Sequence, residues 1–171
     1  MSYILKGGGM VCIVATCSAV GIVLRKRLID RADCLEKLIA MLDYFSAQIS
    51  YARMPVGEIV AHMARQSQFA TLGFLQECSA LLLDGVMFPQ AWRRSAALQR
   101  HLLSKDDYER LVSIGDNLGI TDAKEQQKTI ELYARMFEKS YETARAECTA
   151  HAKMYLSLGV LVGIGLAILM V

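Results

Sequence analysis

Uncharged residues form a long run near each end of the chain, and the length of these runs predicts two membrane spans. Residues 7–24 and 154–171 contain no charged side chain. A helix of this length extends roughly 27 Å, which is close to the thickness of the hydrocarbon core of a bilayer. We therefore expect an N-terminal transmembrane helix within residues 1–24 and a C-terminal one at residues 154–171.

Apolar residues between the two runs recur at intervals of three and four, the period of amphipathic helices. In the first segment these positions are Leu28, Ala32, Leu35, Leu38, Ile39, Leu42, Phe45 and Ile49. The spacing predicts one long helix that continues from the first span. It should stop near Arg53, because Pro55 disfavours helical geometry in Met54.

Four shorter helices are predicted next, at residues 56–65, 69–83, 89–103 and 104–118. Asp84-Gly85 closes the helix at 69–83, and Ser104 caps the helix at 104–118. We expect Gly119 to supply the left-handed position after Leu118, because glycine adopts that conformation without steric cost.

The sixth predicted helix has a defined start, because Asp122 can accept backbone N–H bonds while Glu125 reaches back to complete a capping box. No glycine or proline follows until Gly159, so one helix can run through to Val171. It would pack as an antiparallel partner along the first long helix. With no alternating strand pattern, the sequence predicts an all-α bundle of about six helices at residues 25–153, whose two long outer helices continue into the spans.

Local charge places the bundle in the cytoplasm. Basic residues 25–27 and Arg31 follow the first span and Lys153 precedes the second, so the positive-inside tendency puts the middle segment on the cytoplasmic face. The formal net charge of +2 says little about partners. Cleavage of the first span as an export signal is the alternative, which the weak n-region with Lys6 and the lack of a good cleavage site disfavour.

Residue types used in metal or nucleophilic chemistry are not grouped in this chain. The five cysteines and three histidines lie in separate segments, and no Cys-x-x-Cys occurs. We expect small buried thiols in a reducing compartment. The sequence therefore predicts no catalytic residue, no metal and no cofactor.

Two charged clusters have structural interpretations. Trp92 beside Arg93-Arg94 has the composition of a nucleic-acid patch, but a pair of arginines usually forms a solvated helix face, so we expect no nucleic-acid partner. Asp106-Asp107 occupies the first turn of a predicted helix, where negative charge is favourable. We expect these carboxylates to stabilise the helix.

The segment between the fifth and sixth helices contains the most specific pattern. The run Leu118-Gly119-Ile120-Thr121-Asp122, followed by Gln126-Gln127, resembles the stage III sporulation protein AB family of endospore-forming bacteria. The resemblance extends over nearly the whole chain, including the turn at Met54-Pro55 and Trp92. The soluble part of that family is similar to the cytoplasmic domain of the type II secretion F protein, a small helical bundle in an inner-membrane platform.

The resemblance implies a non-enzymatic scaffold or adaptor in a secretion-like channel complex between mother cell and forespore. The chain would lie in the mother-cell membrane facing the forespore and work near a secretion-type ATPase and other subunits. Secretion F proteins have two helical domains and three spans, whereas this chain has one domain and two spans, so a full platform would need oligomers or other subunits. A membrane-anchored enzyme or regulator with an unrecognised site is the alternative.

The same resemblance matches Leu118, Gly119, Asp122 and Gln127 to the turn of the family. We interpret these residues as a structural corner between the last two helices, with direct partner contact as the alternative. The ATPase-binding surface, the stoichiometry and any transported substrate stay open.

The second span contains Gly159-x-x-x-Gly163, a spacing that lets membrane helices approach closely. Ala15 and Ala19 offer a small face on the first span. This pattern does not distinguish packing between the two spans from assembly of a homo-oligomer.

Overall fold

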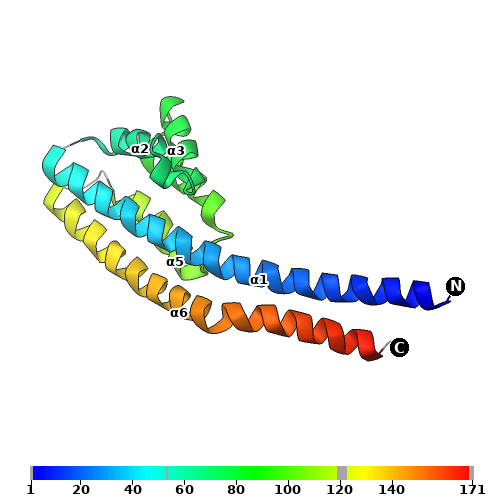
Figure 1. The fold of residues 1–171 in the computed structure, drawn as a ribbon. Helices are drawn as coiled ribbons and strands as arrows, with labels where there is room; N and C mark the ends of the chain where they lie inside the picture. Colours follow the sequence, from blue (N-terminus) through cyan, green and yellow to red (C-terminus); the bar gives the residue numbers. More distant parts are fainter. Residues whose placement is uncertain (1, 53, 119–122, 170–171) are drawn as a thin grey trace. The chain divides into compact units, whose positions relative to one another are not determined.

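The computed structural model describes residues 2–52, 54–118 and 123–169, with side chains described at residues 16, 19–50, 54–118, 124–150 and 154. The described residues are all-α, which confirms the predicted class (Figure 1). The helices are α1 (Ser2–Ala47), a π-helical segment (Gln48–Ala52), α2 (Val56–Ala64), α3 (Gly73–Leu83), α4 (Phe88–Ala96), α5 (Lys105–Asn117) and α6 (Ala123–Leu169), with 3-10 turns at Ser67–Phe69 and Ala97–Gln99. The long helices that the sequence predicts are present as α1 and α6.

The chain divides into two compact units. One comprises Met1–Ala32 and Thr143–Val171, and the other comprises Asp33–Glu142. Helices α1 and α6 therefore contribute one end to each unit. The predicted boundaries after residue 24 and before residue 154 are not tested by this division and stay predictions.

Transmembrane spans are not supported by the described part of the chain. Within that part, no helix combines the length and the apolar character that crossing a bilayer requires. Most residues of the predicted spans, 1–24 and 154–171, have side chains outside the described set. The two spans therefore stay a prediction.

Two predicted helices are interrupted in the structure. The one expected at 69–83 begins only at Gly73, because the chain turns at Phe69 and Leu72, whose side chains are both buried. The one expected at 89–103 ends as an α-helix at Ala96 and tightens into a 3-10 turn in which Gln99 is buried. Burial of these side chains within the unit overrides the local helical pattern.

Helix α3 ends at the predicted position, in a Schellman motif. Gly85 has a φ of 82°, which is the left-handed region that favours glycine. Its N–H donates to the carbonyl oxygen of Leu82 at 3.1 Å, and the N–H of Val86 donates to Leu81 at 3.0 Å. These bonds satisfy carbonyl groups that the end of a helix would otherwise leave unpaired.

Trp92 is fully buried in the core of the Asp33–Glu142 unit. Its ring meets Phe45 and Phe74 edge to face, with centroids 6.0 Å and 5.1 Å away, and a tilted Phe88 at 5.5 Å. The indole N–H donates to the carbonyl oxygen of Leu111 at 2.7 Å. One side chain therefore connects α1, α3, α4 and α5, and its polar atom is satisfied.

Gly115 makes room for that ring. It is buried on α5, one turn after Leu111. A Cβ atom at this position would overlap Trp92 Cδ1 and lie 2.5 Å from Cγ. The close packing of α4 against α5 therefore requires glycine here.

Candidate functional site

The predicted corner between α5 and α6 is described only in part. Gly119 and Asp122 lie outside the described residues. Leu118 is buried and its N–H donates to the carbonyl oxygen of Ile114 at 3.0 Å. The side chain of Gln127 donates through Nε2 to Oε1 of Glu131, one turn along α6, at 3.1 Å. The structural or interface role of these four residues stays a prediction.

Residues near the predicted spans form a second region of interest. Gly159 and Gly163 lie in α6, but their surroundings fall outside the described residues, so their packing role also stays a prediction. The described end of the first predicted span exposes large apolar side chains, namely Val20 (55%), Ile22 (55%), Val23 (51%) and Leu24 (38%). The next three residues, 25–27, are basic and exposed.

A polar cluster joins the start of α5 to the middle of α6. Asp107 is 1% exposed, and its Oδ2 accepts a hydrogen bond from the hydroxyl of Ser104 at 2.6 Å. Its Oδ1 accepts from the hydroxyl of Ser140 at 2.6 Å and from Nη1 of Arg110 at 2.9 Å. Nη1 of Arg110 also lies 3.0 Å from the hydroxyl oxygen of Ser140. We call these four residues the Asp107 cluster.

Local sequence explains three of the four residues of the Asp107 cluster. Ser104 is the N-cap of α5, as predicted, and its Oγ accepts the backbone N–H of Asp107 at 3.1 Å. Arg110 follows one turn later on the same face of the helix. Ser140, by contrast, comes from another helix, and no local pattern in the sequence identifies it. The sequence therefore predicts the cap but not the connection to α6.

The hydrogen bonds of the Asp107 cluster offset the cost of burying its carboxylate, because a buried carboxylate is tolerated only when charged or hydroxyl donors satisfy it. The side chain of Arg110 is 33% exposed, so the positive charge of the ion pair keeps contact with solvent. The neighbouring Asp106 is exposed. The two carboxylates that the sequence places together therefore have different roles.

Cys34 and Cys78 are buried in the Asp33–Glu142 unit. Burial, with a further contribution from the charge of Asp107, raises the pKa of the Cys34 thiol to about 12. Burial also raises the pKa of Cys78 to about 11, although a hydrogen bond with Ser95 opposes the shift. Both cysteines are therefore protonated at neutral pH, and neither has the thiolate character of a reactive nucleophile. This confirms the prediction of buried thiols for Cys34 and Cys78.

We expect Cys34 and Cys78 to resist alkylation by iodoacetamide in the native protein. At about pH 8, a thiol with a pKa near 12 is about 10⁻⁴ ionised, whereas a free cysteine is about one quarter ionised. Cys148 is half-buried and serves as the internal comparison. Peptide mapping by mass spectrometry should show Cys148 modified first and all three modified after denaturation. Rapid native labelling of Cys34 would contradict the burial described here.

The described residues form neither a nucleic-acid patch at Trp92 nor a metal site. Trp92 is fully buried and cannot stack on a nucleotide base. Arg93 binds both carboxylate oxygens of Asp116 through Nη2, at 2.7 Å and 2.9 Å. In the part of the chain that the structure describes, no group of three His, Cys, Asp or Glu residues is placed to hold a metal ion. The expected absence of metals and cofactors stays a prediction.

Comparison with known proteins gives one family. Residues 6–171 match the family described as Stage III sporulation protein AB. The chain is 31% identical over 169 residues to the Stage III sporulation protein AB of Bacillus subtilis (strain 168), which covers 97% of this chain and 99% of that protein. No solved structure matches the chain.

Proposed function

Because the chain belongs to the stage III sporulation protein AB family, we propose that it is a membrane-anchored scaffold of the sporulating mother cell. In this proposal it is a subunit of a secretion-like channel complex facing the forespore, and its helical bundle docks a secretion-type ATPase. The observation that carries the proposal is the family match over residues 6–171, which includes the bundle and nearly all of both predicted spans.

Exposed apolar residues support the membrane anchor. Val20, Ile22, Val23 and Leu24 occupy four of five successive positions, so their side chains point to several sides of α1. Large apolar side chains exposed on several sides of one helix are typical of a surface that lipid covers. In the proposal, residues 1–24 and 154–171 span the membrane, and the bundle lies in the cytoplasm.

The contacts within the bundle support a scaffold. Two buried polar contacts connect separate segments of the bundle: the Asp107 cluster joins α5 to α6, and Nε2 of Gln99 donates to the carbonyl oxygen of Thr71, in the turn before α3, at 3.3 Å. Cys34 and Cys78 are buried and protonated at neutral pH. These groups are engaged in packing, which suits a rigid domain that binds other proteins.

The turn between α3 and α4 is the surface that we assign to partner contact. Leu83 is 86% exposed and Met87 is 68% exposed, on either side of the Schellman turn at Gly85. Leucine and methionine at such exposure lose unfavourable contact with water when a partner covers them. The hydrogen bonds of the Schellman turn fix the backbone between them, so they are presented in a defined arrangement.

The experiment that tests this proposal is a crosslinked pull-down of the tagged protein from sporulating cells, with partners identified by mass spectrometry. A tagged, unrelated two-span protein controls for nonspecific membrane capture. We expect recovery of a secretion-type ATPase and of channel subunits. Recovery of neither, with the protein intact and in the membrane fraction, would contradict the scaffold function.

A matched pair of variants locates the contact. Leu83→Ser/Met87→Ser removes the apolar residues at the α3–α4 turn and should lower ATPase recovery. Leu98→Ser removes a residue of the same kind that is 52% exposed elsewhere in the same unit, and it should not. Equal recovery from both variants would show that the α3–α4 turn is not the docking surface.

A further inference from the structure

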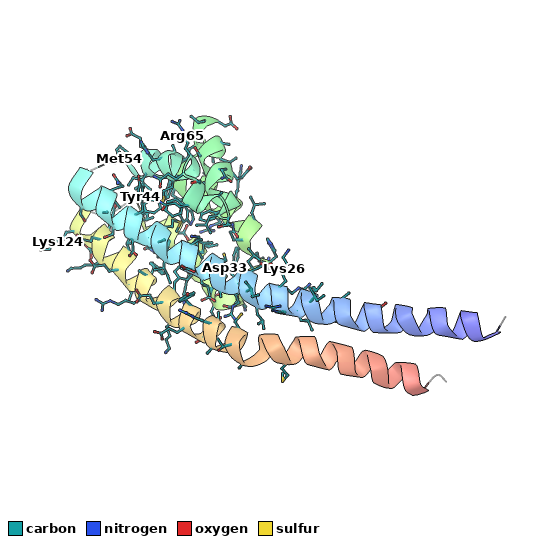
Figure 2. All side chains as sticks on the ribbon, viewed as in Figure 1. Lys26, Asp33, Tyr44, Met54, Arg65 and Lys124 are labelled. Carbon is teal, nitrogen blue, oxygen red and sulfur yellow. The ribbon has the colours of Figure 1, made fainter. Side chains whose placement is uncertain are left out.

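Three exposed basic residues follow directly after the exposed apolar end of the first predicted span. Arg25, Lys26 and Arg27 are all exposed, as are Val23 and Leu24 before them. Figure 2 labels Lys26 on α1. The change from apolar to basic side chains therefore occurs between two consecutive residues of one uninterrupted helix.

Helix geometry arranges these three residues as a collar. Successive residues of an α-helix are about 100° apart around the axis and about 1.5 Å apart along it. Arg25, Lys26 and Arg27 therefore cover about 200° of the circumference within about 3 Å of helix length. We call this arrangement the basic collar. A basic strip that binds an acidic helix or groove would instead repeat every three or four residues along one face.

The positive charges of the basic collar are not taken up by the ion pairs of the described residues, whereas the next basic residue, Arg31, forms one. Nη1 of Arg31 lies 3.0 Å from Oε2 of Glu147, with both residues in the same unit. Among the ion pairs of the described residues, none includes a member of the collar. Asp30 follows one turn later, but residues 25–31 still carry four positive charges and one negative charge, a net +3.

We infer that the basic collar binds the headgroup phosphates of anionic phospholipids such as phosphatidylglycerol. Phosphates of one leaflet lie at one depth around a membrane helix, and the collar presents its charges at one depth over more than half of the helix circumference. Exposed Val23 and Leu24 would contact the acyl chains of the same lipids. The inference rests on the membrane anchor of the proposed function and adds a lipid class that the protein selects.

The selectivity should be large enough to measure. A basic side chain at an anionic membrane surface contributes a factor of about five in affinity, which corresponds to ~1 kcal/mol. Long flexible side chains reach the phosphate level from the end of a span. Added salt should weaken the preference, because these charges are exposed to solvent.

Native mass spectrometry of the full chain tests the inference. The purified protein is released from mixed micelles that contain equal amounts of phosphatidylglycerol and phosphatidylcholine, and the two bound lipids are counted. We expect the wild-type protein to retain phosphatidylglycerol over phosphatidylcholine by about fivefold or more. The variant R25Q/K26Q/R27Q should retain the two lipids about equally.

Two further variants separate a specific site from general charge. K124Q/K128Q/R135Q removes the same number of positive charges from exposed positions on α6 and should keep the wild-type preference. R25K/R27K preserves the charge of the collar and should keep it as well. A wild-type ratio near one, or equal loss in the α6 variant, would overturn the inference.

Failure of the lipid inference can be told apart from failure of the proposed function. Membrane fractions of the expressing cells are washed with sodium carbonate, and the full chain is followed by immunoblot. Retention in the washed membrane together with a lipid ratio near one would reject only the basic collar as a lipid site. Complete release from the membrane would reject the anchor and the lipid inference together.

Discussion

Gly115→Ala will destabilise the Asp33–Glu142 unit by about 3 kcal/mol, because overpacking at a backbone contact has few ways to relax. The new Cβ would overlap Trp92 Cδ1 and lie 2.5 Å from Cγ and 2.9 Å from Cβ of the same side chain. Trp92 cannot turn aside easily, since Phe45 and Phe74 meet its ring edge to face and the carbonyl oxygen of Leu111 accepts its N–H. Denaturant unfolding monitored by far-UV circular dichroism measures the loss.

Gly57→Ala is the matched control for that substitution. Its Cβ would lie 3.8 Å from Cδ1 of Leu82, an ordinary van der Waals distance, in the short helix α2. Replacing glycine by alanine inside a helix stabilises it by up to about 1 kcal/mol, so this variant should unfold at the same or higher denaturant concentration. If Gly115→Ala behaved like Gly57→Ala, the close packing of α5 on Trp92 would be wrong.

Asp107→Ala should lower the free energy of unfolding by about 3 kcal/mol, which is the usual scale for breaking a buried ion pair. The substitution removes the acceptor for two hydroxyl groups and for Arg110. Arg110 is partly exposed, so its guanidinium recovers some hydration and the loss should fall at the lower end of the usual range. The same denaturant titration measures it.

Asp106→Ala provides the comparison for this second substitution. Asp106 precedes Asp107 in the same helical turn but is exposed, so its loss should change stability by about 0.5 kcal/mol or less. Ser140→Ala should fall between the two, because it removes one hydrogen bond to the carboxylate from α6. Equal effects of Asp106→Ala and Asp107→Ala would mean that helix-dipole charge, and not the link to α6, determines stability.

Helix positions were predictable because they depend on neighbours in sequence. The spacing of Leu35, Leu38 and Leu42 predicts the buried face of α1, Ser104 predicts the start of α5, and Asp84-Gly85 predicts the end of α3. Each signal operates over one or two turns, and the structure confirms each. The late start of α3 at Gly73 is not predictable from local sequence, because it depends on the burial of Phe69 and Leu72 within the unit.

Contacts between distant residues could not be predicted in the same way. Ser140 follows Asp107 by 33 residues, and Gly115 follows Trp92 by 23, so neither pairing leaves a periodic pattern. From the sequence alone, Asp107 is interpretable only as a helix-end charge, and no pattern marks Gly115 as a packing position. The corner at Leu118, which the family resemblance indicates, lies at the opposite end of α5 from the Asp107 cluster.

The single tryptophan of the chain makes the bundle optically separable from the rest of the protein. Trp92 is fully enclosed, with its indole N–H bonded to a carbonyl oxygen, so its emission should be blue-shifted in the native state and move to longer wavelength when the bundle opens. Neither predicted span contains a tryptophan. Fluorescence of the unmodified full chain in a bilayer would therefore report the bundle alone, and a soluble quencher would measure how often its interior becomes accessible.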